Sequence, residues 1–345
     1  MSSSLPSLVL VAGAFALSAA VTAWLARRPH AGLLDHPNER SLHQSPVPRS
    51  GGVGVLVGLT LPLVVATAAQ GLEAAQVWLG LAAALVAAVS LWDDFGHVSR
   101  RLRLIVHGAA ALLLVTGGMV WDRLDLPGLD WGLPSALGLG LTILYAVWMI
   151  NLYNFMDGMD GFAGGMGLFG FGALAVLGWQ GGEPVFGLVA ACTAAACAGF
   201  LTSNFPPARI FLGDLGSSTL GLLAAGLSLW GQRRGLFPLW AAWLAFSPFI
   251  VDATWTLLRR LARGERIWEP HRSHNYQRLV LAGWGHRKTV LRGYLVMAAA
   301  AACAVAAPSL PVRDQWALLL GWAAIYALIG VRVRLVERQA MAGPP

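Results

Sequence analysis

The sequence is poor in charged residues and in cysteine. Asp, Glu, Lys and Arg make up 12% of its 345 residues, whereas hydrophobic residues make up 57%, and the mean hydropathy is +0.62. A chain with so little polar surface cannot cover a soluble globule, so it belongs in lipid. The three cysteines, Cys192, Cys197 and Cys303, fall inside apolar runs. A thiol there is usually a small buried hydrophobe, with neither a disulfide nor a metal role.

Other features are missing as well. Met1–Pro6 carry no Lys or Arg and no small-residue cleavage pattern follows, so we expect the first apolar run to stay as a membrane helix. The net charge of +7 comes without a basic patch interleaved with aromatic residues, so nucleic acid is not an expected partner. No repeat or low-complexity linker divides the chain, which predicts one integral membrane domain over residues 1–345.

Apolar runs long enough to cross a bilayer recur along the whole chain. About 20 helical residues span a hydrocarbon core of ~30 Å. The sequence therefore predicts an all-α polytopic membrane protein with about eleven transmembrane helices. The expected spans are Leu5–Ala26, Gly52–Ala69, Ala74–Trp92, Leu102–Val120, Pro134–Ile150, Gly161–Trp179, Pro184–Thr202, Ser217–Trp230, Phe237–Leu258, Val290–Ala307 and Gln315–Val331.

The basic residues orient these spans. With the N-terminus in the periplasm, the outer loops hold only Arg123, Arg233, Arg234 and Arg313, which leaves 20 of the 24 Lys and Arg on the inner side. Because basic residues are enriched on the cytoplasmic side, the count predicts a periplasmic N-terminus and a cytoplasmic C-terminus. The motifs described next all fall in inner loops, which favours one shared site.

Two motifs rich in oxygen donors lie at the ends of spans. Asp93-Asp94 follows the third span and precedes Arg103. Paired carboxylates can hold Mg²⁺ or act as a base, and an arginine can bind phosphate oxygens. The alternative is a cluster of charges that only marks the end of a helix at the membrane interface. In Asn151–Gly161, side chains three residues apart would lie within reach of one another on a helix and suit a hard cation. An ordinary turn with helix caps uses the same residue types. These side chains are Asn151, Asn154, Asp157 and Asp160.

Asp214 and a basic loop form the next candidates. Asp214 stands at or near the start of the eighth span, where it is a metal ligand or only a helix cap. The loop carries His271-Arg272-Ser273-His274, which can clasp a pyrophosphate through the arginine fork and protonated histidines. Topology and anionic lipid are the alternative for such a loop. The first inner loop offers cations near the membrane surface, or only braces the bundle. Its cations are Arg40, His43 and Arg49.

These stretches together resemble the polyprenyl-phosphate N-acetylhexosamine-1-phosphate transferase family. The resemblance covers nearly the whole chain and rests on the order and shared side of Asp93-Asp94, Asn151–Gly161, Phe211-Leu212-Gly213-Asp214 and a His-rich last inner loop. His271-Arg272-Ser273-His274 with Tyr276 is more similar to the branch that initiates O-antigen than to the peptidoglycan translocase, whose loop carries adjacent histidines.

The resemblance implies a role for each candidate. Asp93 and Asp94 match the catalytic pair that activates the lipid phosphate, and Asn154 and Asp214 match Mg²⁺-binding positions, with Mn²⁺ as a substitute. The implied nucleotide-sugar residues are Asn151, Asp157, Asp160 and Phe211, whose ring would stack on uracil. The implied phosphate-binding residues are Arg103, His271, Arg272 and His274. Asn38, Arg40, His43 and Arg49 would serve the lipid phosphate or the structure of their loop.

The implied reaction transfers N-acetylhexosamine 1-phosphate from a UDP-sugar to undecaprenyl phosphate and releases UMP. It would start an O-antigen-like polysaccharide at the cytoplasmic face of a bacterial inner membrane, and a homodimer stays open. One alternative is a secondary transporter, whose binding groups lie near the bilayer midplane, where only Asp252 is expected here. The other is an inactive relative in a membrane assembly. Such a relative would be expected to lose some of the acidic residues that are all present.

Overall fold

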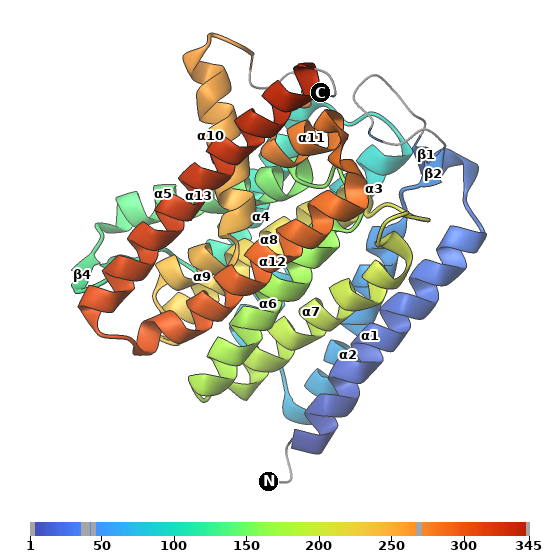
Figure 1. Cartoon of the computed structure of the whole chain (residues 1–345). Helices are drawn as coiled ribbons and strands as arrows, with labels where there is room; N and C mark the ends of the chain where they lie inside the picture. Colours follow the sequence, from blue (N-terminus) through green and yellow to red (C-terminus); the bar gives the residue numbers. More distant parts are fainter. Residues whose placement is uncertain (1–3, 36–41, 43–45, 267–270, 343–345) are drawn as a thin grey trace.

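The apolar runs fold into helices that pass back and forth through one bundle (Figure 1). The computed structural model describes residues 4–35, 42, 46–266 and 271–342. The helices are α1 (Ser4–Arg27), α2 (Gly51–Gln70), α3 (Ala74–Phe95), α4 (Arg100–Thr116), α5 (Ser135–Phe155), α6 (Phe162–Gln180), α7 (Pro184–Asn204), α8 (Gly213–Arg233), α9 (Leu239–Ala245), α10 (Ser247–Ala262), α11 (Asn275–Leu279), α12 (Gly285–Ala306) and α13 (Val312–Met341).

Short elements connect these helices. Strand β1 (Leu34–Asp35) pairs antiparallel with β2 (Val47–Pro48), and β3 (Arg123–Leu126) with β4 (Leu129–Gly132). The helical turns are η1 (Ala31–Leu33), the π-helical η2 (Val280–Trp284) and η3 (Ala307–Ser309). The β3–β4 hairpin was not expected from the sequence, which predicted only a loop between the fourth and fifth spans.

Helix occupies each of the eleven predicted spans, and the all-α multi-pass architecture is confirmed. By length and composition, eight helices in the described part of the chain can cross a membrane, or nine if α9 and α10 count as one bent span. The chain begins and ends at opposite ends of the bundle, as an odd number of crossings requires (Figure 1). The count of eleven and the sidedness stay predictions.

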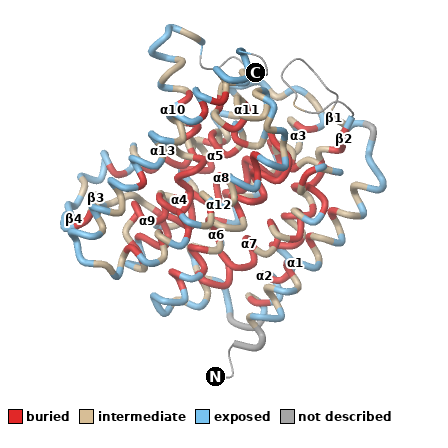
Figure 2. Tube along the Cα trace, in the orientation of Figure 1, coloured by how far each residue is buried: buried red, intermediate tan, exposed pale blue. Residues whose placement is uncertain are grey.

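Helix α8 lies at the centre of the bundle, against α2, α3, α5, α6 and α9. Residues 215–232 are all buried, in contrast to the exposed outer faces of the surrounding helices (Figure 2). A Cβ on Gly221 would lie 2.5 Å from the Met149 carbonyl oxygen, so glycine lets α5 approach closely. Thr219 and Ser228 each donate to the carbonyl four residues earlier at 2.6 Å. Because protein surrounds α8 and its hydroxyls are satisfied, the helix can be less apolar than a lipid-facing one.

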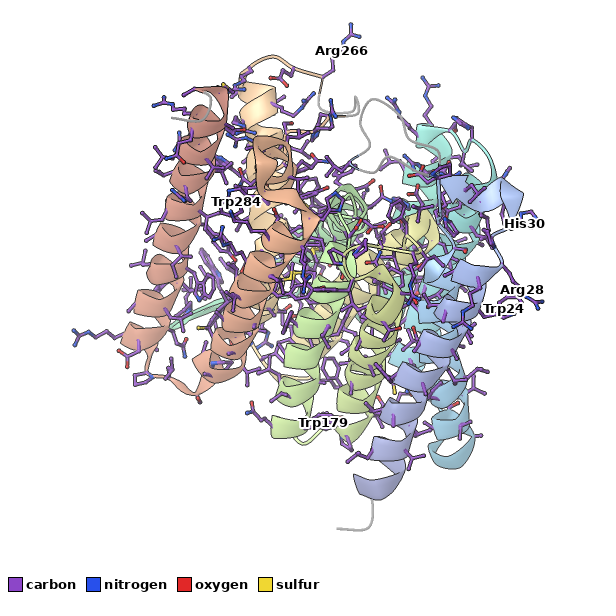
Figure 3. All side chains as sticks on the ribbon, turned by 45° about the vertical axis from the view of Figure 1, so that its right-hand side comes forward. Trp24, Arg28, His30, Trp179, Arg266 and Trp284 are labelled. Atoms are coloured by element: carbon purple, nitrogen blue, oxygen red, sulfur yellow. The ribbon has the colours of Figure 1, made fainter. Side chains whose placement is uncertain are left out.

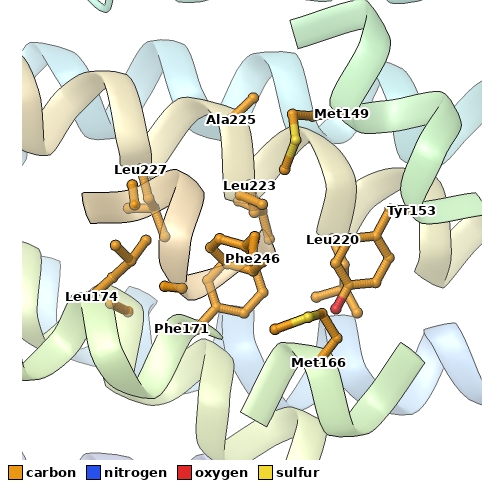
Figure 4. Packing of buried hydrophobic residues seen from close by; sticks show 14 of the residues in the cluster. Met149, Tyr153, Met166, Phe171, Leu174, Leu220, Leu223, Ala225, Leu227 and Phe246 are labelled. Carbon is orange, nitrogen blue, oxygen red and sulfur yellow. The ribbon is translucent and has the colours of Figure 1, made fainter. Parts of the chain in front are cut away.

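The predicted span Phe237–Leu258 is not straight. Helices α9 and α10 meet at Phe246 with a bend of 84°. Pro248, in the first turn of α10, has no N–H to continue the α9 hydrogen bonds, which explains the break. The Phe246 ring packs edge-on against Phe171 at 5.3 Å between centroids (Figure 4). Gly170 makes room for it, since a Cβ there would lie 2.4 Å from the Phe246 ring.

The two ends of the bundle differ in chemistry. Arg266 and Trp179 mark these opposite ends in Figure 3. The end near Trp179 holds a cavity of about 440 Å³ between α3, α4 and α8. Its arginines are paired, because Arg233 contacts Asp122 and Arg234 contacts both Glu73 and Glu183. The predicted site residues lie at the other end, so this cavity takes no part in the candidate site.

Candidate active site

An arginine joins two of the predicted acidic residues where α3, α4 and α8 meet. Arg103 Nη1 lies 2.5 Å from Asp93 Oδ2 and 3.2 Å from Asp214 Oδ2. The other Asp93 oxygen accepts a hydrogen bond from the Val98 amide at 2.9 Å. The side chains of Asp93, Arg103 and Asp214 are 14%, 33% and 35% exposed, so a ligand can reach them.

Asp94 points away from Arg103 and caps α8. Its Oδ1 accepts from the Asp214 amide at 3.0 Å and its Oδ2 from the Leu215 amide at 2.9 Å. Arg49 Nη2 donates to the Asp94 carbonyl at 2.6 Å, which ties the first inner loop to this point. Gly213 has φ +76°, and a Cβ there would lie 2.3 Å from the Arg49 carbonyl oxygen. Asp94 therefore fixes the position of Asp214.

Helix α5 brings an amide to the same place, and the segment that follows it brings another carboxylate. Asn154 Nδ2 donates to Asp214 Oδ1 at 2.8 Å and to Ser217 Oγ at 3.0 Å. Burial raises the pKa of Asp157 well above its usual range, and the charge of Asp214 raises it further. Burial also raises the pKa of Asp214, although the Asn154 hydrogen bond and the Arg103 charge oppose this. Negative charge is thus crowded at this point. Ser217 was predicted only as the start of a span.

Two of the predicted nucleotide-sugar residues make supporting contacts. Asn151 Nδ2 donates to the Val147 carbonyl at 2.7 Å, within its own helix. Asp160 Oδ2 accepts from the Ala208 amide at 3.0 Å, and its Oδ1 lies 2.9 Å from His286 Nδ1. Asp160 therefore joins the α5–α6 and α7–α8 loops to α12. The three-residue spacing suggested one cluster, but helix α5 ends at Phe155, so the later residues do not continue its face.

The loop before α11 is held beside α5 and α6. Asp252 accepts from the Asn275 amide at 2.8 Å and the Tyr276 amide at 3.3 Å. Arg259 Nη2 donates to the Ser273 carbonyl at 2.8 Å, and the Tyr276 hydroxyl to the Phe155 carbonyl at 3.3 Å. Asp252, visible in the sequence as a lone carboxylate in an apolar run, is thus an anchor for this loop. The sequence did not predict that role.

The two histidines of this loop are not cations in the structure. Burial lowers the pKa of His271 and of His274 to about 4, and neighbouring positive charges contribute. The rings lie 4.8 Å apart, and His274 stacks on Tyr276 at 5.9 Å. The expectation of protonated histidine donors is not supported, although neutral imidazole still has one N–H. Arg272 is exposed and forms no hydrogen bond or ion pair with any residue the structure describes.

The first inner loop is described in part. The predictions for Asn38, Arg40 and His43 lie outside the described residues, whereas Arg49 lies at the site through its contact with Asp94. Phe211 is half-buried, and its backbone pairs with the same loop. Its amide donates to the Pro48 carbonyl at 2.7 Å, and its carbonyl accepts from the Gly51 amide at 2.9 Å.

The oxygen donors at this place suit a hard divalent cation. Mg²⁺ is usually held by one or two carboxylates together with water and substrate phosphates. Asp214 and Asp157 can supply the carboxylates, and a cation would oppose both the burial and the Asp214 charge that raise the pKa of Asp157. Asn154 turns its amide nitrogen to Asp214, so coordination through its oxygen requires the amide to rotate. Within the described ranges, no three His, Cys, Asp or Glu side chains could hold a metal by themselves.

The fold and these residues define a multi-pass membrane protein with an acidic, arginine-containing site at one end of its bundle. The model of glycosyl transferase family 4 matches residues 76–232, from α3 to α8. These elements carry Asp93, Arg103, Asn154 and Asp214. The first inner loop and the loop before α11 lie outside that match.

Relatives extend the similarity over most of the chain. The decaprenyl-phosphate N-acetylglucosaminephosphotransferase of Mycolicibacterium smegmatis is 31% identical over 339 residues, 89% of this chain and 83% of the relative. A probable undecaprenyl-phosphate N-acetylglucosaminyl 1-phosphate transferase of Bacillus subtilis is 29% identical over 270 residues, 77% and 74% of the two chains. The undecaprenyl-phosphate alpha-N-acetylglucosaminyl 1-phosphate transferase of Escherichia coli K12 is 26% identical over 317 residues, 88% and 84%. The chain belongs to glycosyl transferase family 4, the polyprenyl-phosphate N-acetylhexosamine-1-phosphate transferases.

Proposed function

We propose that this chain transfers N-acetylhexosamine 1-phosphate from a UDP-sugar to undecaprenyl phosphate and releases UMP. The observation that carries the proposal is the convergence of Asp93, Arg103 and Asp214 at one bundle end, in a chain of this family. Relatives named for transfer to undecaprenyl or decaprenyl phosphate support the acceptor class.

The bond changes in this reaction need charge neutralisation more than covalent help. An oxygen of the lipid phosphate bonds to the β-phosphorus of the nucleotide sugar, and the bond from that phosphorus to the bridging oxygen breaks. UMP then leaves with the bonding electron pair. Such transfers depend on positioning and on cations beside the anionic oxygens. Arg103 is suited to this, because it already lies between two carboxylates and can turn to a phosphate.

The resemblance implied that Asp93 and Asp94 are both catalytic, but we propose a different role for each. Asp93 is partly exposed and is the group that can accept a proton from a protonated lipid phosphate. Asp94 is 2% exposed and both its oxygens are engaged by backbone amides, so it is a positioning residue for α8.

We assign Mg²⁺ binding to Asp214 and Asn154, with Asp157 beside them and Mn²⁺ as a substitute. When bound, the ion would neutralise diphosphate oxygens and stabilise the leaving UMP. Arg272, with His271 and His274 as neutral donors, would hold the diphosphate from the loop before α11. For the nucleotide sugar, Asp157 and Phe211 are better placed than Asn151 and Asp160, whose side chains make structural contacts.

The position of the site fits an amphipathic acceptor. The lipid tail must stay in the bilayer while its phosphate meets a water-soluble nucleotide sugar, and a site at a bundle end allows both. We therefore propose the cytoplasmic side of a bacterial inner membrane, and an O-antigen-like polysaccharide as the polymer. No observation favours a transporter, because Asp252 has both oxygens engaged by the start of α11.

The test is UMP release by the purified chain with undecaprenyl phosphate, Mg²⁺ and a panel of UDP-GlcNAc, UDP-GalNAc and UDP-6-deoxy-HexNAc. We expect one donor to yield UMP and a lipid-linked sugar, with both lost on adding EDTA and restored by excess Mg²⁺. Asp214→Asn should lower the rate by about 100-fold or more, as for loss of a group that stabilises transition-state charge. Full activity of that variant would contradict the metal assignment, and no product from any donor would contradict the reaction.

A further inference from the structure

A basic aromatic patch lies where α12 begins. Trp284 ends the π-helical η2, and the flanking Gly283 and Gly285 have φ of +90° and +69°, which glycine adopts without strain. The resulting turn brings the indole ring over the first turns of α12. Lys288 Nζ lies 4.7 Å and Arg292 Cζ 4.1 Å from the ring centroid. Two cations therefore share one aromatic ring (Trp284 is labelled in Figure 3).

These cations have no acidic partner among the residues that the structure describes. Arg287, Lys288 and Arg292 are exposed, and none pairs with a carboxylate in the described ranges of the chain. Glu337 lies on α13, a helix that contacts η2, but Arg278 already binds it at 2.6 and 2.5 Å. Three positive charges that no described carboxylate neutralises attract an anion.

The neighbouring residues on α12 indicate which anion. Thr289 and Val290 are buried against the bundle, whereas Leu291 and Leu295 are 45% and 73% exposed. Exposed leucines on a membrane helix face acyl chains. Cations within a turn or two of them lie at the level of the lipid headgroups, where tryptophan is also enriched. A soluble anion would not need this adjoining apolar face.

We infer that Trp284, Lys288 and Arg292 bind the phosphate of an anionic bilayer phospholipid, whose acyl chains lie along Leu291 and Leu295. We assign it as a structural ligand separate from the acceptor of the proposed reaction, because neither Trp284, Lys288 nor Arg292 contacts Asp93, Arg103 or Asp214. It would hold the first turn of α12, where His286 contacts Asp160 2.9 Å away. Anionic lipid is thereby linked to the loop that borders the candidate active site.

Native mass spectrometry of the full chain in detergent can test this site. The probes are phosphatidylglycerol and phosphatidylcholine with the same acyl chains. We expect the chain to retain phosphatidylglycerol preferentially. Lys288→Gln with Arg292→Gln should raise the concentration needed for half occupancy by at least about tenfold, as expected for two cations lost near a lipid surface. The exchanged pair Lys288→Arg with Arg292→Lys should keep the preference.

The matched control removes two exposed arginines elsewhere, through Arg332→Gln with Arg334→Gln. This control should bind phosphatidylglycerol as tightly as the unmodified chain does. All variants should have the same unfolding temperature as the unmodified chain. Equal weakening in both double variants would show only general charge attraction and would overturn the site, as would unchanged binding in Lys288→Gln with Arg292→Gln. Competition by inorganic phosphate as strong as that by the lipid would identify a soluble-anion site instead.

Discussion

At the scale of single residues, identical neighbours at the end of α3 have different partners. Successive side chains on a helix point about 100° apart, because a turn takes 3.6 residues. Asp93 therefore reaches Arg103, while Asp94 reaches the amides of α8. The division of roles follows from this geometry and can be tested with one matched pair of substitutions.

We expect Asp93→Asn to lower UMP release by about 100-fold or more, the scale of a lost acid–base group. Its unfolding temperature should fall less than that of Asp94→Asn, because Asp93 is more exposed than Asp94 and asparagine keeps an oxygen for the Val98 amide. Asp94→Asn should cost about 1 kcal/mol of stability, because one of the two oxygens that accept the amides of α8 is replaced by an NH2 group, which cannot accept a hydrogen bond. Thermal unfolding in detergent, measured beside UMP release, checks both. The proposed roles of Asp93 and Asp94 are contradicted if the Asp93→Asn protein is the less stable of the two, or if it keeps its activity.

The sequence predicted which residue types gather, and less about where each one points. Asp93, Asn154 and Asp214 could be chosen because their motifs lie at the ends of apolar spans on one predicted side. The engagement of Asp160 with Ala208 and His286 depends on contacts between segments distant in the chain. Spacing along one helix does not encode such contacts.

At the scale of elements, the loop before α11 should make stability depend on pH. The pKa values of His271 and His274 are about 4, against an ordinary value of 6.5. Between these values the unfolded chain binds protons that these two histidines do not bind in the folded chain, so the stability that they contribute should fall as pH decreases from 6.5 towards 4. We expect His274→Gln to make this fall shallower, as measured by unfolding temperature across that range. His97→Gln removes an exposed histidine and should keep the original slope; equal slopes in all three proteins would contradict the buried, neutral state.

Helix positions were predictable from apolar run length, because crossing a bilayer fixes the number of residues needed. Three details were not. The bend between α9 and α10 needed the packing of Phe246 against Phe171 as well as Pro248. Helix α8 begins at Gly213, four residues before the predicted Ser217, because Asp94 caps it from another helix. The β3–β4 hairpin forms by pairing on either side of Pro127-Gly128, where the sequence predicted only a loop.

At the scale of the whole molecule, the two ends of the bundle differ in the residues that they gather. The end with the C-terminus also holds α11 (Figure 1) and the candidate site, while the other end pairs its arginines with carboxylates. The proposed reaction requires the site end to face the cytoplasm, where nucleotide sugars are available. Sidedness is therefore the property of the whole chain on which the proposal depends.

Substituted cysteines can measure that sidedness in intact cells with a membrane-impermeant maleimide. Cys192 and Cys197 are buried and Cys303 is half-buried, so the native background should be low. Asp130→Cys, on a β4 side chain that is 64% exposed, should react from outside. Arg100→Cys, at the exposed start of α4, should react only after the membrane is opened. The reverse pattern would place Asp93 and Asp214 outside, away from any nucleotide sugar. It would contradict the proposed reaction but not the fold.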